Sequence, residues 1–170
     1  LYVGNHGNIL EDARSNCRLV RLDTPLLKRA QFEALAGIEK HGFKSHVLSA
    51  TYAADSDPHA LAKALDRLHQ EAETAVQDGT SLIIISDRAD AGSVPIPSLL
   101  AVASVHNHLL RRGLRTHADI IVECGDAITP HDFAALVGYS ASGVYPYLVH
   151  ETIGSLCEHG ILDIDADAAV

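Results

Sequence analysis

The sequence contains no methionine or tryptophan and only three cysteines among its 170 residues. Cys17, Cys124 and Cys157 are odd in number, widely spaced, and include no Cys-x-x-Cys pair. This argues against a disulfide framework, a structural zinc site or an iron–sulfur cluster held by this segment alone. We therefore expect a reducing, cytoplasmic setting. Because even position 1 is not methionine, we also expect the segment to be a piece of a longer chain.

Basic residues are also scarce. Lys and Arg number 13 against 22 Asp and Glu, which gives a formal net charge of -9, and no basic run is longer than Arg111-Arg112. Such a chain cannot neutralise many phosphates, so nucleic acids and anionic membrane surfaces are not expected partners. No window approaches the roughly 18 to 20 apolar residues of a membrane span. The N-terminal stretch LYVGNHGNIL lacks the basic and apolar blocks of an export signal.

The length fits one domain, because a chain of this size buries roughly 70% of its unfolded surface. Residues 1–24 lack sustained periodicity and are expected to form an extended linker segment. Residues 25–160 are expected to form the folded domain, and residues 161–170 an acidic tail.

Strand and helix patterns alternate along residues 25–160. A short helix is expected at 26–38, with Gly42 as its stop signal, and Asp57 and Pro58 provide the N-cap and first residue of a long helix that ends at Gly79. The remaining elements follow the same rules for apolar periodicity and capping. They are strands at 45–53, 81–86, 119–124 and 143–145, and helices at 97–112, 130–137 and 146–160.

About four strand-then-helix units predict an α/β fold with a mostly parallel sheet. The same local unit builds an open doubly wound sheet and a section of a (βα)8 barrel, so both remain open. We favour a sheet that curves like a partial barrel.

In either architecture, ligands gather at the carboxyl edge of the parallel strands. The polar, aromatic and thiol side chains expected there are Thr51, Tyr52, Ser86, Asp87, Arg88, Glu123, Cys124 and Tyr145. Asp87 and Arg88 fit an acid and an anion clamp, but adjacent opposite charges just past a strand more often form a local cap or an interface pair. Cys124 fits a nucleophile, yet a small buried thiol is the commoner role.

Eleven histidines raise the possibility of a metal site. His106 and His108 lie two apart on an expected helix, hence about 200° apart around its axis, and cannot chelate one ion together. His131 fits a helix N-terminus, and His41, His59, His69 and His159 fit solvated positions. The phosphate-binding glycine patterns and the nucleophile elbow are absent. We therefore assign no catalytic, cofactor-binding or metal residue from the sequence.

Three ordered segments resemble the central domain of the glutamate synthase large chain. They are LIIISDR (82–88), VPIPSLLAVASVHNHLLRRGLRT (94–116) and IIVECGDAITPHDFAALVGYSASGVYPYLVHETI (120–153). The stretch NILEDARSNCRLVRLDTPLL is similar to the family's linker between the glutaminase and central domains, with Leu22-Asp23-Thr24-Pro25 at a Leu-acidic-small-Pro step.

This resemblance implies a non-catalytic part of an enzyme. In the family, an N-terminal amidotransferase domain releases ammonia from glutamine, and an FMN-bearing barrel uses that ammonia to convert 2-oxoglutarate to glutamate. The central domain would space these two centres and wall part of an ammonia channel, with Thr51 as a candidate. Because ammonium is not nucleophilic, a dry path has chemical value. FMN and an iron–sulfur cluster are implied for the full enzyme, with none in this segment.

The implied partners are the flanking amidotransferase and FMN-binding domains, and a small subunit or ferredoxin for the full enzyme. The alternative functions are a free-standing α/β enzyme that uses the edge formed by Asp87, Arg88 and Glu123, or a plain scaffold module. One departure from the family pattern is Gly138-Tyr139-Ser140-Ala141, where the family commonly has Gly-Tyr-Gly-Ala. If position 140 needs a positive φ, serine there costs about 1 kcal/mol.

Overall fold

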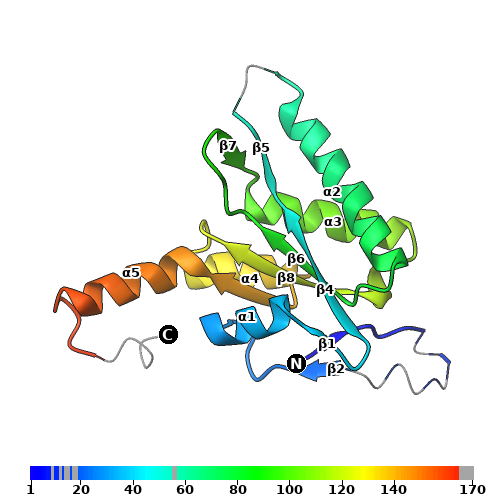
Figure 1. The fold of residues 1–170 in the computed structure, drawn as a ribbon, viewed down its shortest axis with the longest axis horizontal. Coiled ribbons are helices and arrows are strands. Elements are labelled where there is room, and N and C mark those ends of the chain that lie inside the picture. Colours follow the sequence, from blue (N-terminus) through cyan, green and yellow to red (C-terminus); the bar gives the residue numbers. More distant parts are fainter. Residues whose placement is uncertain (9, 12, 14–15, 17–18, 55–56, 165–170) are drawn as a thin grey trace.

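The computed structural model describes residues 1–8, 10–11, 13, 16, 19–54 and 57–164, and its center is a five-stranded sheet (Figure 1). Four strands are parallel and lie in sequence order, and a short antiparallel strand pairs with the first of them. The sheet runs in the order β3 (Glu39–Lys40), β4 (Phe43–Ser49), β6 (Leu82–Ser86), β8 (Asp119–Cys124), β9 (Gly143–Pro146). The α/β prediction is confirmed.

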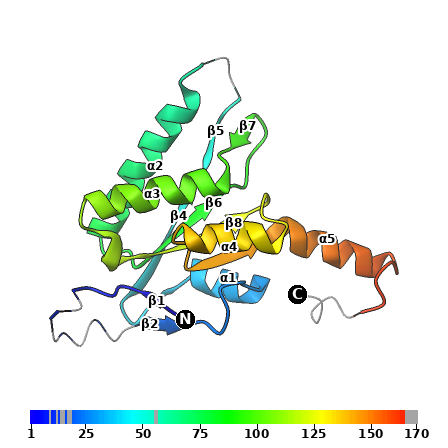
Figure 2. The same cartoon turned by 180° about the vertical axis from the view of Figure 1, so that it is seen from behind.

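The described residues form five α-helices, of which α2, α3 and α4 cover one face of the sheet, α1 covers the other, and α5 extends outward (Figures 1 and 2). They are α1 (Arg29–Ala36), α2 (Ala60–Gln77), α3 (Ser98–Arg111), α4 (Pro130–Gly138) and α5 (Tyr147–Glu158). Two small antiparallel pairs complete the fold: β1 (Tyr2–Gly4) with β2 (Leu19–Arg21), and β5 (Thr51–Ala53) with β7 (Ser93–Pro95). A 3-10 turn, Arg115–His117, precedes β8.

The two central strands are buried on both faces, so their alternating residues feed two separate cores. Ile83 and Ile85 of β6 pack with residues of α2, α3 and α4. Leu82 and Ile84 point to the other face and pack with Leu27, Phe32 of α1 and Val3 of β1. Side chains from residues 1–24 therefore contribute to the second core.

The placement of the helices distinguishes the two architectures left open by the sequence. Consecutive parallel strands are neighbours throughout the order β4, β6, β8, β9, and the helices that connect them contribute to one and the same core. A doubly wound sheet would reverse its strand order and place helices on both faces. The arrangement matches a section of a barrel-type sheet, with α1 and the β1–β2 pair on the face where a closed barrel has its interior.

The structure corrects several predicted boundaries. The expected strand at 45–53 is two strands, because Ala50 ends the pairing of β4 with β6 and β5 turns away to pair with β7. Asp57 is not the N-cap of α2: the helix begins at Ala60 with His59 as its N-cap, and Asp57 accepts the His59 N–H at 2.9 Å.

The first helix is also shorter than expected. It begins at Arg29 and ends at Ala36, and Gly37 is its C-cap. Gly42 does not stop this helix. With His41 it forms the two-residue turn of the β3–β4 hairpin, and both residues have positive φ values, 56° and 86°. Positive φ at both central positions is typical of a type I′ turn.

The predicted capping box of α4 is confirmed, since the Thr129 side chain accepts the Asp132 N–H and Asp132 accepts the Thr129 N–H at 2.7 Å. At the other end of α4, Ser140 has a φ of 81°. Its N–H donates to the Val137 carbonyl, and the Ala141 N–H donates to the Leu136 carbonyl, both at 3.0 Å. These bonds form a Schellman motif, so serine occupies a position that favours glycine.

A buried carboxylate, that of Asp119, helps to hold the N-terminal segment against the sheet. Asp119, at the start of β8, accepts hydrogen bonds from the Gly4 N–H and the Ser142 hydroxyl, each at 2.9 Å. His6 Nε2 also lies 2.9 Å from Asp119, and Arg115 lies 3.3 Å away. β1 is therefore connected to β8 through polar contacts as well as through the apolar contacts of Val3.

Candidate functional site

The carboxyl ends of the four parallel strands meet in one row. The strand register places Ser49, Ser86, Glu123 and Tyr145 side by side on β4, β6, β8 and β9. The sequence therefore predicted correctly that Ser86, Glu123 and Tyr145 share an edge. Tyr145 is buried there by stacking on Phe32 of α1, with ring centroids 4.6 Å apart.

Glu123 is the center of this edge. Its side chain is only 10% exposed, and each carboxylate oxygen has a donor of its own. The Ser86 hydroxyl donates to Oε2 at 2.7 Å, and Arg88 Nε donates to Oε1 at 2.6 Å. A buried carboxylate with these two donors is already satisfied, because the charge-assisted bonds offset its loss of hydration.

Arg88 links this edge to the last helix. Its guanidinium lies 3.8 Å from the centroid of the Tyr147 ring and 3.6 Å from Glu151 Oε1. Tyr147 and Glu151 lie in the first half of α5. The same guanidinium therefore pairs with Glu123 on the sheet and with both residues of α5, through ion pairs and a cation–π contact.

Asp87 lies on the other side of the edge and is buried. Its Oδ2 accepts the Gly125 N–H at 2.8 Å. Burial raises the pKa of Asp87, although the Gly125 hydrogen bond works in the opposite direction. Burial, followed by the negative charge of Asp87, raises the pKa of Tyr147 to about 12. The absence of a side chain at Gly125 permits the close approach of α5, because a Cβ there would lie 2.8 Å from Leu148 Cδ1 and 2.9 Å from the Tyr147 hydroxyl.

Cys124 does not have the environment of a nucleophile. It has no exposed surface, and burial raises the pKa of its thiol to about 12. An activated cysteine needs a lowered pKa and access to its substrate. The buried-thiol interpretation is therefore the one that the geometry supports. Cys157 is also a free thiol, and Cys17 lies outside the described residues.

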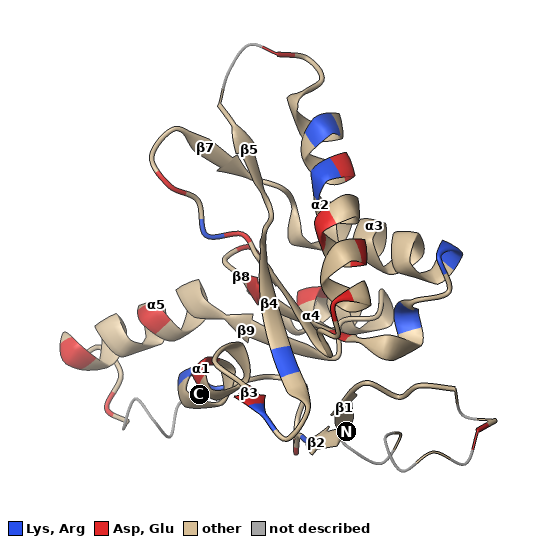
Figure 3. Cartoon of the chain, turned by 45° about the vertical axis from the view of Figure 1, so that its right-hand side comes forward, with Lys and Arg blue, Asp and Glu red and all other residues tan. Residues whose placement is uncertain are grey.

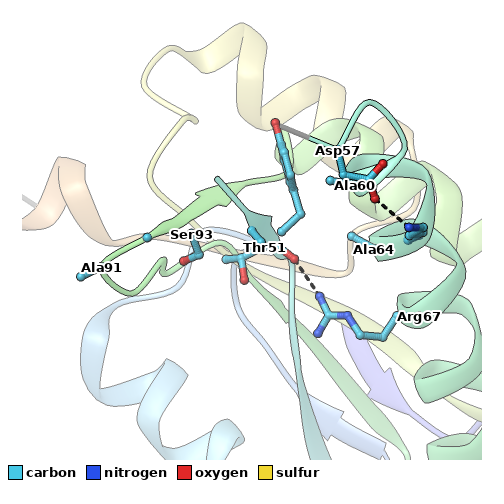
Figure 4. A pocket seen from close by; sticks show the side chains of 11 residues that line it. Thr51, Asp57, Ala60, Ala64, Arg67, Ala91 and Ser93 are labelled. Atoms are coloured by element: carbon cyan, nitrogen blue, oxygen red, sulfur yellow. Dashed lines mark hydrogen bonds and ion pairs between the residues drawn. The ribbon is translucent and has the colours of Figure 1, made fainter. Parts of the chain in front are cut away.

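Thr51 (Figure 4) and Tyr52 lie on β5, which has left the main sheet and pairs with β7, so they lie apart from Arg88 and Glu123. Thr51 lines an open groove of about 610 Å³ between α2 and the β5–β7 pair. Arg67 of α2 donates to the carbonyl of Thr51 at 2.7 Å and to that of Ser49 at 2.9 Å. The structure thus separates two sets of residues that the sequence placed at one edge.

The predicted separation of His106 and His108 around their helix is confirmed, but the prediction for His69 is wrong. His106 contacts Arg115, whereas His108 contacts Glu73 of α2 at 2.9 Å, so the two rings serve different neighbours. His69 is not a solvated side chain as expected. It stacks on His108 with ring centroids 4.7 Å apart, and burial and the His108 charge lower its pKa. Among the described residues, no group of three or more His, Cys, Asp or Glu side chains is placed to hold a metal ion.

At this edge, Ser86, Arg88 and Glu123 bond to one another and Arg88 also contacts Tyr147 and Glu151, whereas the buried Oδ1 of Asp87 has no hydrogen-bond partner among the described residues. Sequence reasoning missed Tyr147 and Glu151, whose only signal was their position in the first turns of a helix that follows a parallel strand.

Basic and acidic side chains occur together along α2, a pattern unlike a phosphate-binding surface (Figure 3). No helix in the described part of the chain has both the length and the apolar character of a bilayer span.

Comparison with known proteins gives a consistent result along the whole chain. Residues 1–169 match the model of a family described as the glutamate synthase central domain. The chain is 39% identical over 170 residues to the NADPH glutamate synthase large chain of Bacillus subtilis, covering 99% of this chain and 11% of that protein. It is 35% identical over 158 residues to the NADH glutamate synthase of Schizosaccharomyces pombe, covering 91% and 8%.

A third relative is the chloroplastic ferredoxin-dependent glutamate synthase of Oryza sativa, which is 38% identical over 154 residues, covering 88% of this chain and 9% of that protein. The chain thus spans about a tenth of the length of the curated relatives it matches. With a family match over residues 1–169, the chain belongs to the glutamate synthase central domain family.

Proposed function

We propose that the chain is the linking domain of a glutamate synthase large chain, which holds a glutamine amidotransferase domain and an FMN-bearing synthase domain at a fixed separation. The family match over residues 1–169 is the observation that carries this proposal. The hydrogen bonds at the carboxyl edge of the sheet support it, because Ser86, Arg88 and Glu123 bond to one another. The catalytic groups, FMN and an iron–sulfur cluster would then lie in other parts of the large chain.

The electron donor would also act outside this segment. The matched relatives are named for three different donors, NADPH, NADH and ferredoxin, and their identities to this chain lie between 35% and 39%. A segment that contacted the donor would have to accommodate three dissimilar partners. This supports a structural role for the segment and leaves donor recognition to a small subunit or to another domain.

The groove lined by Thr51 is our candidate for the wall of the ammonia path. Arg67 closes one side of the groove by donating to the carbonyl of Thr51 (Figure 4). Ser49 and Thr51 hydroxyls lie 3.0 Å apart and bond to each other. These hydroxyls can hydrogen-bond to uncharged ammonia without protonating it, whereas contact with bulk water would convert most of the ammonia to ammonium; the groove is also lined by the charged residues Asp57, Lys63 and Arg67.

The linking role is tested in the full-length large chain that contains this segment. The 170 residues are replaced by a flexible Gly/Ser linker of equal reach, with retained flavin absorbance as the check on folding. Glutamine hydrolysis and glutamate formation from added ammonium should each stay within about threefold of the unmodified enzyme. The yield of glutamate per glutamine hydrolysed should fall, because ammonia then escapes.

Two results would contradict the proposal. Loss of ammonium-dependent glutamate formation while the flavin stays bound would place a catalytic group in this domain. An unchanged yield of glutamate per glutamine would show that the two centres do not need it as a spacer.

A further inference from the structure

A polar cluster connects several parts of the fold at the amino end of the parallel strands, opposite the edge that holds Glu123. Its center is Arg115, in the 3-10 turn before β8, whose side chain is only 15% exposed. Arg115 donates to the Ala118 carbonyl at 2.6 Å and to the Ser140 carbonyl at 3.0 Å. It also donates to Asp119 Oδ1 at 3.3 Å. One guanidinium therefore connects the start of β8 to the turn between α4 and β9.

A further contact of Arg115 determines the charge of a histidine on α3. Arg115 Nε donates to Nδ1 of His106 at 3.1 Å. Because a guanidinium stays protonated and can only donate, Nδ1 must supply the lone pair of this hydrogen bond. The His106 ring is therefore neutral and carries its hydrogen on Nε2. The surroundings favour this state, since burial and then the positive charge of Arg115 lower the pKa of His106.

Asp119 extends the cluster to β1. Its Oδ2 accepts the Gly4 N–H at 2.9 Å and lies 2.9 Å from His6 Nε2, while its Oδ1 accepts the Ser142 hydroxyl at 2.9 Å. A ring nitrogen that faces a carboxylate acts as a donor, so a proton on His6 preserves its contact with Asp119. The two histidines of the cluster therefore respond to a proton in opposite ways.

A proton on His106 Nδ1 would place an N–H group and a positive charge directly against the Nε–H of Arg115. Among the described residues, Arg115 is the charged group that faces His106, with Asp119 and His6 behind it. The turn before β9 contributes only the Ser140 carbonyl and an uncharged hydroxyl to this cluster. Because the guanidinium is rigid and planar, Arg115 cannot leave His106 without shifting its other donors as well.

We propose that His106, Arg115 and Asp119 form a pH-sensitive lock at the amino end of the sheet, and that a proton on His106 opens it. With His106 neutral, the lock holds the turn between α4 and β9 through the Ser140 carbonyl, and it holds β1 through Asp119. With His106 protonated, Arg115 moves away, so the Ser140 carbonyl loses a donor and Asp119 loses its cation. The lock is a property of the fold and does not depend on the proposed function.

The test measures amide hydrogen exchange by mass spectrometry in the full-length large chain at pH 7.5 and at pH 5. Each rate is expressed as a protection factor, which corrects for the intrinsic pH dependence of exchange. Because the pKa of His106 is lowered in the fold, the lock is complete above the ordinary histidine value of about 6.5 and opens as the pH falls through the folded value. Protection of residues 139–143 and 2–6 should therefore fall by about threefold or more at pH 5.

His106→Asn separates the hydrogen bond from the titration, because the amide oxygen can accept from Arg115 Nε but takes up no proton in this range. At pH 7.5 its protection should stay within about twofold of the unmodified chain, and the fall at pH 5 should be less than about 1.5-fold. His117→Asn is the matched control. It makes the same substitution in the turn that holds Arg115, and the His117 ring forms no hydrogen bond to Arg115, so the full fall should remain.

Arg115→Lys is a second variant that keeps the positive charge but cannot reach His106, Asp119 and Ser140 at once. Its protection in both segments should already be low at pH 7.5 and change little at pH 5. Equal protection at the two pH values in the unmodified chain would overturn the lock, because the His106 ring would then turn away without releasing Arg115. An equal fall in His106→Asn and His117→Asn would overturn it as well, since another group would be the one that titrates.

Discussion

At the scale of single residues, Ser140 is the clearest case of local strain. It takes a φ of 81° at the C′ position of α4, where an L-residue with a side chain is disfavoured and glycine is not. We predict that Ser140→Gly raises the free energy of unfolding by about 1 kcal/mol, measured by urea denaturation. Ser140→Ala keeps a Cβ and should change it by less than about 0.5 kcal/mol. If Ser140→Gly is no more stable than Ser140→Ala, the backbone at position 140 is not strained.

His69 gives a second prediction at this scale. Burial, the neighbouring His108 charge and Arg111 lower its pKa, although Asp66 acts in the opposite direction. A lowered folded pKa means that the neutral ring is favoured in the fold. The neutral His69 ring therefore contributes its full stability above the pKa of about 6.5 that histidine has in the unfolded chain. This contribution is lost as the pH falls through the lower pKa that His69 has in the folded protein.

We therefore expect the free energy of unfolding to fall between pH 7.5 and pH 5, and His69→Gln to make that fall smaller. Denaturant titrations of both proteins at the two pH values measure this difference. An equal or steeper fall in the His69→Gln protein would contradict the assignment.

At the scale of secondary-structure elements, Arg88 connects α5 to the sheet. Arg88→Ala leaves Glu123 buried with one donor fewer and removes the cation–π contact to Tyr147. Because the Arg88 side chain is 47% exposed, solvent screening limits the loss to about 1–2 kcal/mol. Hydrogen exchange in α5 should accelerate at the same time.

The matched control for Arg88 is Arg29→Ala, which breaks an exposed ion pair with Glu33 and should cost less than about 0.5 kcal/mol. If the two variants lose the same stability, Arg88 is not the anchor of α5.

Asp119 connects β1 to the sheet, as Arg88 connects α5. Asp119→Asn replaces one acceptor oxygen with an amide NH2, so either the Gly4 N–H, which bonds to Oδ2, or the Ser142 hydroxyl, which bonds to Oδ1, loses its acceptor. We expect a loss of about 2–3 kcal/mol and faster exchange over Tyr2–Gly4. Asp23→Asn changes only an exposed pair with Arg21, so urea denaturation should show a loss below about 0.5 kcal/mol. Unchanged exchange in β1 of the Asp119→Asn protein would contradict this account.

The elements that the sequence predicted best are those with local signals. β8 begins and ends at the expected residues because its apolar run is continuous, and α4 begins at Pro130 because a capping box precedes it. β5 and β7 were not predicted as a pair, since short strands that pair across a helix leave no local pattern. The contact of Arg88 with Tyr147 and Glu151 was missed for the same reason, although the shared edge of Ser86 and Glu123 followed from the parallel order alone.

At the scale of the whole molecule, the proposed function assigns the catalytic chemistry to other parts of the large chain and assigns this domain the roles of a spacer and a channel wall. Ser86, Arg88 and Glu123 of its polar edge bond to one another, the Cys124 thiol is buried, and α5, which has no buried residue, is directed away from the sheet (Figures 1 and 2). The family match covers the whole chain yet only about a tenth of each relative.

The most direct measurement of this claim is the rate of both half-reactions in the full-length large chain that carries the near-isosteric changes Glu123→Gln and Cys124→Ser together. We predict kcat values within about threefold of the unmodified enzyme for glutamine hydrolysis and for ammonium-dependent glutamate formation. A loss of about a hundredfold or more in either rate, with the flavin bound and the fold intact by circular dichroism, would place a catalytic group in this domain.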